Sequence, residues 1–395
     1  MAIPYLLVGN IKEDGTYLRK TKNHFQSLNI QEVSGLAETV DVKNKQVKLA
    51  GGKSLAYDKL LIATGSQPVR PPIPGIDSPG VHPCWTLEDA RAIQKLAKPG
   101  ARVLQMGAGF IGCIILEALA SRGVDLTVVE MGNRMVPRMM TEGAGTLIKE
   151  WVQSKGVTVY TDTKVEAITP VQSSGGIVSK IAGIFGGSST SPLQVKLSNG
   201  KTIEVDLVIS ATGVRPNIAY LKNSGIEINT GILVDNKMQT SVPDVYAAGD
   251  VTESVDFSTG KRIVNAIQPN AAEQAKIAGA NMVGGKAESQ GTIQINVLDT
   301  LGLISSSFGQ WWGVEGGDHV ELRDAKNFKY MRLEFNGDVL IGATSCGLTE
   351  HVGAFRGLIQ TRVPLGEWKE HLMHDPTKIM DAYLAKAQAR SQWMS

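Results

Sequence analysis

Cysteine is scarce in this sequence: its 395 residues include only Cys84, Cys113 and Cys346. They lie far apart and form no Cys-x-x-Cys pair, so the sequence supports neither a disulfide framework nor a zinc site. A reactive thiol needs an electropositive, partly exposed setting, so we expect Cys84, beside Trp85, and Cys113 to be buried small residues. Without a disulfide framework, the reducing cytoplasm is the expected location.

The sequence also lacks an excess of charge and any long apolar run. Forty Lys and Arg stand against 38 Asp and Glu, and no long basic run suggests a nucleic-acid partner. Apolar stretches such as 111–120 are too short to span a bilayer, and no secretory leader opens the chain. We therefore expect neither a nucleic-acid nor a membrane partner. A composition of 42% hydrophobic and 20% charged residues, at this length, indicates two or three globular domains.

What the sequence does contain is a dinucleotide-binding pattern over residues 103–130. An apolar run, 103–106, leads into Gly107-Ala108-Gly109-Phe110-Ile111-Gly112, an apolar helix and a second apolar run. In this pattern the first glycine turns the chain, the second lets the backbone approach a pyrophosphate, and the third lets the helix pack on the sheet. The N–H groups of the first helical turn, including Phe110 and Ile111, then face the phosphates.

The second apolar run of this unit ends in an acid. Glu130 lies 23 positions after Gly107, where a carboxylate can accept hydrogen bonds from a ribose 2′-hydroxyl. The same carboxylate would repel the 2′-phosphate of NADPH. The sequence therefore predicts an NADH site that consists of Gly107, Gly109, Phe110, Ile111, Gly112 and Glu130.

Two strand ends elsewhere repeat each other. Leu60-Leu61-Ile62-Ala63-Thr64-Gly65 and Val208-Ile209-Ser210-Ala211-Thr212-Gly213 are both apolar runs closed by Ala-Thr-Gly. This repetition predicts two nucleotide-binding sheets, with the chain passing between domains at each glycine. A further apolar run, 245–250, ends in Gly249 and Asp250 at the carboxyl end of a strand, where ligands bind in open α/β sheets.

The remaining pattern predicts the other elements by their spacing. We expect helices over 87–96, 141–154, 269–282, 353–360 and 377–388. We expect an amphipathic segment over 20–28, and small meanders over 30–49 (runs 30–36, 39–42 and 46–49) and 164–205. The second meander contains a Gly- and Ser-rich loop over 173–192. A buried strand over 57–64 precedes a proline-rich domain boundary at 68–83. Strands over 294–298, 319–323, 330–335 and 339–344 predict a separate C-terminal α+β domain.

Taken together, these motifs resemble the FAD-dependent pyridine nucleotide-disulfide oxidoreductase family, most closely its rubredoxin reductase and nitrite reductase flavin-module branch. The resemblance implies an α/β fold with two Rossmann-like domains, the first incomplete, and a C-terminal interface domain. The implied domains are residues 1–80 and 216–290 for FAD, 81–215 for NAD(H) and 291–395 for homodimerisation. It implies cofactor contacts at Ala63, Thr64, Gly65, Thr212, Gly213, Gly249, Asp250, Pro269, Asn270 and Ala271. Of these, Asp250 and the helix that opens at Pro269-Asn270-Ala271 correspond to the family's contacts with FAD.

Three departures from the family pattern stand out. The family opens with its own strand–GxGxxG–helix unit for FAD, and none precedes Met1, so the sequence either starts at an internal methionine or belongs to a truncated protein. Some branches carry a redox cysteine in a Cys-x-x-Pro-Tyr run, whereas here the run is Met1-Ala2-Ile3-Pro4-Tyr5. Disulfide chemistry is therefore not expected. Ile114 stands where members often have a glutamate that reaches the nicotinamide.

The resemblance implies an NADH-dependent flavoprotein that passes hydride to FAD. It would then pass electrons to a small rubredoxin- or ferredoxin-like protein, or act as a reductase subunit. The alternative is a nucleotide-binding, non-catalytic dimeric or assembly protein with a degenerate flavin site. A dehydrogenase with a single Rossmann domain ranks last, because no catalytic His or Tyr-x-x-x-Lys set accompanies the motif. We assign no catalytic residue and no metal ligand.

Other candidate residues have plainer interpretations. His371 and His374 could share a helix face, but no third ligand at useful spacing supports a metal site. Trp311-Trp312 could approach a flavin or fill the interface core, and the core is favoured. Arg134 and Arg138 could touch a phosphate, but exposed surface charge is the default expectation.

Overall fold

The computed structural model describes residues 2–171 and 191–392, and side chains as far as residue 386. It divides into two compact units: residues 1–16, 68–213 and 296–395 form unit 1, and residues 17–67 and 214–295 form unit 2. The predicted 173–192 loop lies outside the described residues except for its last two positions. Within the described ranges, no helix is both long and apolar enough to cross a membrane.

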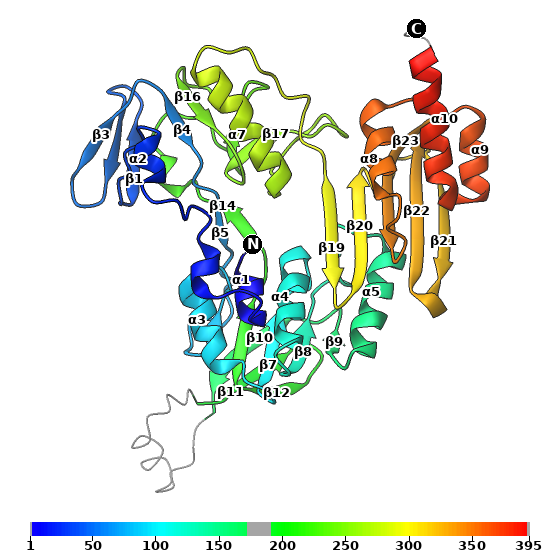
Figure 1. Cartoon of the computed structure of the whole chain (residues 1–395). Coiled ribbons are helices and arrows are strands. Elements are labelled where there is room, and N and C mark those ends of the chain that lie inside the picture. The colour runs from blue at the N-terminus through cyan, green and yellow to red at the C-terminus, as the bar shows by residue number, and fades with distance from the viewer. Residues whose placement is uncertain (1, 172–190, 393–395) are drawn as a thin grey trace, which may run out of the picture. The chain divides into compact units, whose positions relative to one another are not determined.

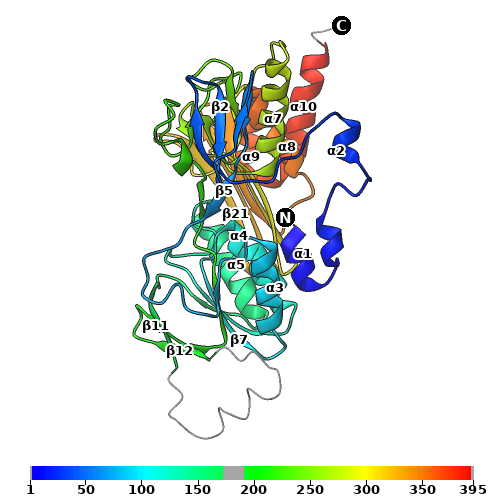
Figure 2. The same cartoon turned by 90° about the vertical axis from the view of Figure 1, so that its left-hand side faces the viewer.

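Unit 1 contains a five-stranded parallel sheet in the order β6-β13-β7-β8-β9. Three helices cover one face of this sheet, and the antiparallel meander β10–β12 covers the other (Figure 2). Alternate strand residues serve the two cores: Val103 and Val128 pack with the helices, whereas Leu104 and Val129 pack with the meander. The strands are β6 (Val81–His82), β7 (Arg102–Met106), β8 (Asp125–Val129), β9 (Thr158–Tyr160), β10 (Val165–Pro170), β11 (Leu193–Leu197), β12 (Thr202–Val205) and β13 (Leu207–Ser210).

The three helices are α3 (Leu87–Leu96), α4 (Phe110–Ala120) and α5 (Glu142–Ser154), and the sequence predicted each of them. Thr86 and Asp89 form a capping box at the start of α3, which fixes where that helix begins. Arg122 donates to the carbonyls of Ala97 (2.8 Å) and Leu7 (2.6 Å). A cation placed on the C-terminal carbonyls of α3 and of the first helix, α1 (Ala2–Val8), stabilises both helix ends. Leu6 and Leu7 of α1 are also buried in the helix core, and this burial places residues 2–8 in unit 1.

The C-terminal part of unit 1 is a five-stranded antiparallel sheet in the order β19-β20-β23-β22-β21, with helices α8 and α10 beside it (Figure 1). Tyr330, Phe335 and Phe355 of this part are fully buried, and Tyr330 packs into the helix core of unit 1. The sequence missed β20. The elements are β19 (Ile295–Thr300), β20 (Leu303–Gly309), β21 (Asp318–Asp324), β22 (Lys329–Asn336), β23 (Val339–Cys346), α8 (Val352–Thr361), α9 (Glu367–His374) and α10 (Ile379–Gln392).

Unit 2 contains several small sheets and one long helix, α7 (Gln268–Met282). One sheet is an antiparallel meander, β1-β2-β3, and another pairs β4 in parallel with β16. Buried Ile62, Val245 and Ala247 pack with Ile277 and Ala278 of α7. The strands are β1 (Ala37–Asp41), β2 (Gln46–Leu49), β3 (Ser54–Ala56), β4 (Leu60–Ile62), β5 (Ser66–Pro68), β14 (Val214–Pro216), β15 (Ile232–Leu233), β16 (Val245–Ala247), β17 (Thr252–Val255) and β18 (Arg262–Ile263).

The structure corrects three predictions in unit 2. The run 30–36 is not a strand: Ile30 is 47% and Leu36 70% exposed, and among the described residues the β1–β2 ladder reaches this run only at Leu36, whose carbonyl accepts the Ala50 N–H at 2.8 Å. The predicted segment 20–28 is helical only in α2 (His24–Ser27). The predicted strand 57–64 is reduced to β4, because its partner β16 ends at Ala247 and the chain then turns at Gly249, which has φ +83°.

Candidate functional site

The glycine turn between β7 and α4 is shaped by a strand from much later in the chain. Gly107 has φ +96°, a conformation that favours glycine, and its N–H donates to the carbonyl of Val129 at 2.8 Å. A Cβ at Gly107 would overlap the carbonyl oxygen of Ala211, which follows β13. The first glycine is therefore required by the fold itself.

Gly109 differs from Gly107 in that nothing in the protein requires it. Its φ is −73°, which any residue adopts, and a Cβ there would meet nothing within 4 Å. Gly109 is the N-cap of α4 and has no side chain to cap the helix, so the first-turn N–H groups remain without a cap bond. The turn thus leaves open space in front of a bare helix N-terminus, which is the arrangement that binds a phosphate group.

Gly112 and Gln105 fix α4 against the strand that leads into the turn. A Cβ at Gly112 would lie 2.5 Å from the carbonyl oxygen of Gly107. Gln105, on β7, is fully buried, and its Nε2 donates to the carbonyls of Gly107 and Gly112, each at 2.9 Å. The sequence analysis missed Gln105, although a polar residue in an otherwise apolar strand was the available signal.

Glu130 lies at the end of β8, directly beside the glycine turn. One carboxylate oxygen accepts the N–H of Ala108 at 2.7 Å, and the other accepts the N–H of Gly132 at 2.8 Å. A carboxylate offers about four acceptor positions, so two remain for hydroxyl groups of a ligand. The structure therefore brings together Gly107, Gly109, Phe110, Ile111, Gly112 and Glu130, as the sequence predicted.

A second group of predicted residues lies together in unit 2. Asp250 follows β16, and its carboxylate accepts the hydroxyl of Ser66 at 3.1 Å. Gly249 has φ +83°, and its N–H donates to the side chain of Gln274 on α7 at 2.8 Å. A Cβ at Gly249 would lie 3.5 Å from that of Ala271, so the start of α7 packs against the end of β16. Gln274, like Gln105, is a buried residue that the sequence analysis missed.

The other residues of the α7 N-terminus point in different directions. Asn270 is buried, and its amide donates to the carbonyl of Ile293 at 3.4 Å. Pro269 is exposed in the first turn, and Ile267, the N-cap, supplies no side-chain cap bond. The helix therefore keeps uncapped N–H groups at this end, which favour negative charge nearby.

The two Ala-Thr-Gly strand ends make separate contacts. In unit 2, the hydroxyl of Thr64 donates to the carbonyl of Asn217 at 3.1 Å, and the Asn217 N–H donates to the carbonyl of Gly65 at 2.9 Å. Ala63 is exposed beside them. In unit 1, Thr212 donates to the carbonyl of Val69 at 3.2 Å, and the Val69 N–H donates to the carbonyl of Gly213 at 2.9 Å.

Two of the other candidates are packing residues. Ile114 packs against the helix core of unit 1. Trp311 is buried, whereas Trp312 is 46% exposed and stacks edge-on against it.

Arg134 corrects an expectation: it is not simply a solvated surface charge. Its guanidinium donates to the backbone carbonyls of Met140 (3.0 Å) and Pro137 (3.1 Å). Arg134 therefore holds the loop between β8 and α5 rather than lying free in solvent.

The three cysteines are free and buried, as predicted for Cys84 and Cys113, and burial raises the pKa of each thiol to about 12. No group of three or more His, Cys, Asp or Glu side chains that could hold a metal ion occurs in the part of the chain that the structure describes. His371, one of the paired histidines, lies with its ring centroid 5.1 Å from that of Trp368.

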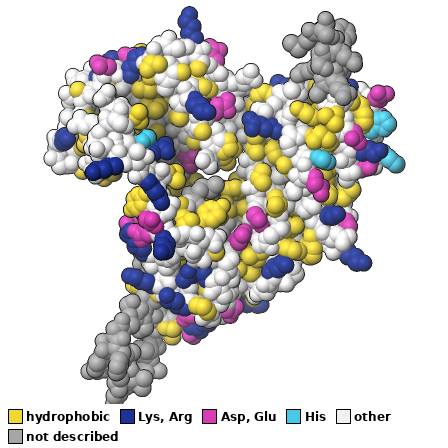
Figure 3. Space-filling model, in the orientation of Figure 1, with side chains coloured by type: hydrophobic (Ala, Val, Ile, Leu, Met, Phe, Trp, Pro, Cys, Tyr) yellow, Lys and Arg dark blue, Asp and Glu magenta, His cyan; other side chains and the backbone are white. Residues whose placement is uncertain are grey.

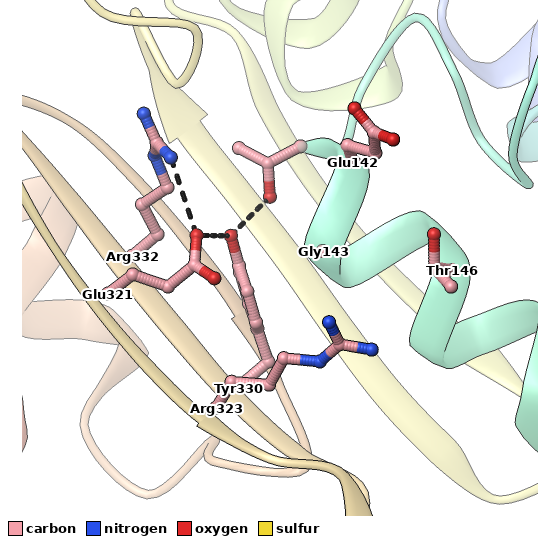
Figure 4. Close-up of a pocket in the computed structure, with 8 residues that line it drawn as sticks. Glu142, Gly143, Thr146, Glu321, Arg323, Tyr330 and Arg332 are labelled. Carbon is pink, nitrogen blue, oxygen red and sulfur yellow. Dashed lines mark hydrogen bonds and ion pairs between the residues drawn. The ribbon is translucent and has the colours of Figure 1, made fainter.

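A separate pocket of about 430 Å³ lies between the start of α5 and strands β21 and β22 (Figure 4). The hydroxyl of Tyr330 lies 2.8 Å from that of Thr141 and donates to Glu321 at 2.8 Å. Glu321 also accepts from Arg332 at 3.3 Å, so these polar groups already satisfy one another.

On the face drawn in Figure 3, basic and acidic side chains are interspersed, which gives no broad field of one sign.

Comparison with known proteins shows what the chain is similar to. A family model described as pyridine nucleotide-disulphide oxidoreductase matches residues 2–275. The NADH-dependent phenylglyoxylate dehydrogenase subunit epsilon of Aromatoleum evansii is 30% identical over 338 residues, which are 85% of this chain and 76% of the relative. An NADH oxidase of Methanocaldococcus jannaschii is 34% identical over 298 residues, which are 73% of this chain and only 62% of the relative.

A solved structure shows the same fold. The covalent complex of putidaredoxin reductase with putidaredoxin matches with a TM-score of 0.84 at 22% identity, over 98% of this chain and 89% of the matched one. At this identity the likeness concerns the fold alone. It agrees with the predicted α/β architecture of Rossmann-like domains followed by a C-terminal interface domain.

Proposed function

This chain belongs to the pyridine nucleotide-disulphide oxidoreductase family, and on that premise we propose that it takes hydride from NADH and passes the electrons to a redox protein. Members of the family are flavin- and nicotinamide-dependent oxidoreductases, so the chain is an oxidoreductase of that class, with FAD and NAD(H) as its cofactors. The observation that carries the proposal is Glu130 bonded to Ala108 beside an uncapped helix N-terminus.

The donors and acceptors of unit 1 fit NADH. The open space at Gly109 and the bare first turn of α4 suit a pyrophosphate. Glu130 has free acceptor positions for the hydroxyls of the adenosine ribose, and its charge favours NADH over NADPH. These residues bind and orient the coenzyme. Hydride transfer needs no protein proton donor, so positioning is the main contribution of the chain.

The residues of unit 2 fit one half of FAD. The Asp250 carboxylate can accept a hydroxyl of the ribitol chain, and the uncapped start of α7 favours negative charge near the flavin ring. The described residues 17–67 and 214–295 contain no strand–glycine turn–helix unit that would suit the ADP half. When bound, FAD supplies the chemistry of accepting a hydride and releasing electrons. The chain's part is to hold the ribitol through Asp250, which Ser66 orients.

For the electron acceptor we propose a small redox protein or the remainder of a larger enzyme complex. The putidaredoxin reductase structure contains such a partner, and the phenylglyoxylate dehydrogenase relative is a subunit. To test electron transfer to a small redox protein, a purified rubredoxin or ferredoxin is added to the NADH-reduced protein, with cytochrome c as the final electron acceptor. Homodimerisation through the C-terminal sheet is proposed as well, and light scattering of the eluted protein measures it.

The test of the main proposal is spectroscopic. The purified chain is incubated with FAD, freed of excess cofactor and titrated with NADH while the flavin bands are followed. We expect bleaching by NADH and steady reduction of an artificial dye. A preparation that takes up no FAD and reduces no dye would contradict the proposal.

The second candidate is a nucleotide-binding protein without turnover, and the incomplete FAD fit of unit 2 favours it. Calorimetry would then show NADH binding, while added FAD would bring no dye reduction. Steady dye reduction would exclude this candidate.

A further inference from the structure

The peptide group between Gly107 and Ala108 is held at both of its ends by side chains. Its carbonyl accepts the Gln105 amide at 2.9 Å, and its N–H donates to Glu130 at 2.7 Å. The same Gln105 nitrogen also donates to the carbonyl of Gly112, in the first turn of α4, at 2.9 Å. One buried amide therefore connects the glycine turn to the helix whose N-terminus faces the open space at Gly109.

The other half of the same amide has no partner. Gln105 is fully buried, and its Oε1 makes no hydrogen bond with any residue that the structure describes. A buried, unpaired acceptor destabilises the folded state, which offsets part of the stability that the two donor bonds of Gln105 contribute. Gln105 thus donates two good hydrogen bonds to the glycine turn and to α4, while its unpaired oxygen lowers the stability of the fold. This combination is typical of a residue that is retained for a binding site rather than for packing of the core.

From this geometry we propose that Gln105 is a positioning residue for the pyrophosphate of the bound dinucleotide. It fixes the Gly107–Ala108 peptide and the first turn of α4, so that the following N–H groups face the ligand. Gln105 touches no ligand itself and acts through the backbone. The proposal rests on the dinucleotide site proposed above, and it adds a residue that neither the glycine pattern nor the terminal acid includes.

The fold predicts which ligands depend on Gln105. Glu130 is held on its other side by the N–H of Gly132, so its place beside the adenosine ribose does not depend on Gln105 alone. The pyrophosphate faces the turn and the first helical turn, both of which Gln105 holds. Loss of the Gln105 amide should therefore weaken the binding of ligands that contain a pyrophosphate more than it weakens the binding of adenosine.

The test is Gln105→Met, which keeps the length and the apolar stem of the side chain and removes the donor. Leu104→Met is the matched control, because it puts methionine on the other face of the same strand. Isothermal titration of the purified full-length chain measures the Kd of NADH, ADP-ribose and adenosine, and thermal unfolding measures Tm. We expect Q105M to raise the Kd of NADH and ADP-ribose about tenfold, the loss of one positioned hydrogen bond. The Kd of adenosine and the Tm, to within about 3 °C, should stay unchanged.

The outcomes separate the two proposals. A wild-type chain that binds no NADH overturns the proposed function. A wild type that binds NADH while folded Q105M binds it within about twofold as well overturns only the role of Gln105. Equal weakening of adenosine and ADP-ribose, together with a fall in Tm, would show a structural residue. If Q105M does not fold, Gln105→Asn, whose shorter amide cannot reach both carbonyls, is measured instead, and failure of both variants to fold also overturns the proposal.

Discussion

The carboxylate of Glu130 lies 2.7 Å from the backbone nitrogen of Ala108 and accepts its N–H. The acid that follows β8 therefore holds the turn between β7 and α4. The second carboxylate oxygen holds Gly132 in the same way. Glu130 is thus both a part of the turn and a candidate ligand group for ribose. Its two roles make it the most informative residue to change.

Glu130→Gln should weaken NADH binding about tenfold or more, equivalent to ~1–2 kcal/mol. The amide that replaces the carboxylate has a single acceptor oxygen, whereas the N–H groups of Ala108 and Gly132 each bond to a separate carboxylate oxygen. The uncharged amide also no longer repels a 2′-phosphate. The preference for NADH over NADPH should therefore shrink. Fluorescence titration with both coenzymes measures this, with exposed Glu38→Gln in β1 as the control. An unchanged preference would contradict the assignment of Glu130.

Gly109→Ala and Gly107→Ala should behave in opposite ways. At Gly109 the backbone is ordinary and the space is open, so G109A should keep its stability and lose NADH affinity about tenfold or more. At Gly107 the positive φ and the Ala211 carbonyl both oppose a side chain, so G107A should lose ~2 kcal/mol or more of unfolding free energy. Urea denaturation and NADH titration of both variants measure this. Normal NADH binding by G109A would show that no phosphate lies there.

Asp206 should make part of the stability depend on pH. The Arg102 guanidinium, 2.7 Å away, holds the pKa of the Asp206 carboxyl below its usual range. Because the folded-state pKa is the lower one, the contribution is present above the unfolded pKa of about 3.9 and is lost as pH falls through the folded value. Asp206→Asn should therefore cost up to ~1 kcal/mol at neutral pH, since the pair is partly exposed, and progressively less in acid. A difference that does not shrink in acid would rule out this linkage.

The three cysteines should resist thiol reagents in the native state. Burial raises the pKa of Cys84, Cys113 and Cys346 to about 12, so almost no thiolate is present at neutral pH. A chromogenic disulfide reagent should label none of them in buffer and all of them in denaturant. Rapid labelling of the folded protein would show that at least one thiol is exposed.

The sequence predicted the part of unit 1 from α3 to β8 well because its signals are local. The glycine spacing and the apolar runs of β7 and β8 each specify their own element. The sequence-based prediction failed where an element depends on contacts with a distant part of the chain. The alternation of 30–36 resembles a strand, but a strand needs a neighbour along its length, and the described ladder reaches this run only at Leu36, whose carbonyl accepts the Ala50 N–H.

Two misses have the same physical cause. Strand β20 contains Ser305, Ser306 and Ser307, which are all fully buried, and Ser306 is satisfied only by the hydroxyl of Ser345 at 2.7 Å. Gln105 and Gln274 likewise gain their roles from backbone groups that the fold brings to them. A polar residue in an apolar stretch indicates that its side chain makes a hydrogen bond, but the sequence does not identify the group with which it bonds.

The contact between Gly107 and the Ala211 carbonyl has a consequence for how the protein matures. The glycine turn between β7 and α4 is complete only when β13 lies beside β7, and the chain reaches β13 after β8, β9 and the whole β10–β12 meander. During synthesis, the glycine turn therefore emerges long before the strand that closes it. A nascent chain that has not yet passed residue 211 has the complete glycine motif but lacks the strand that packs against its first glycine, so this turn takes its final form only late in the folding of the domain.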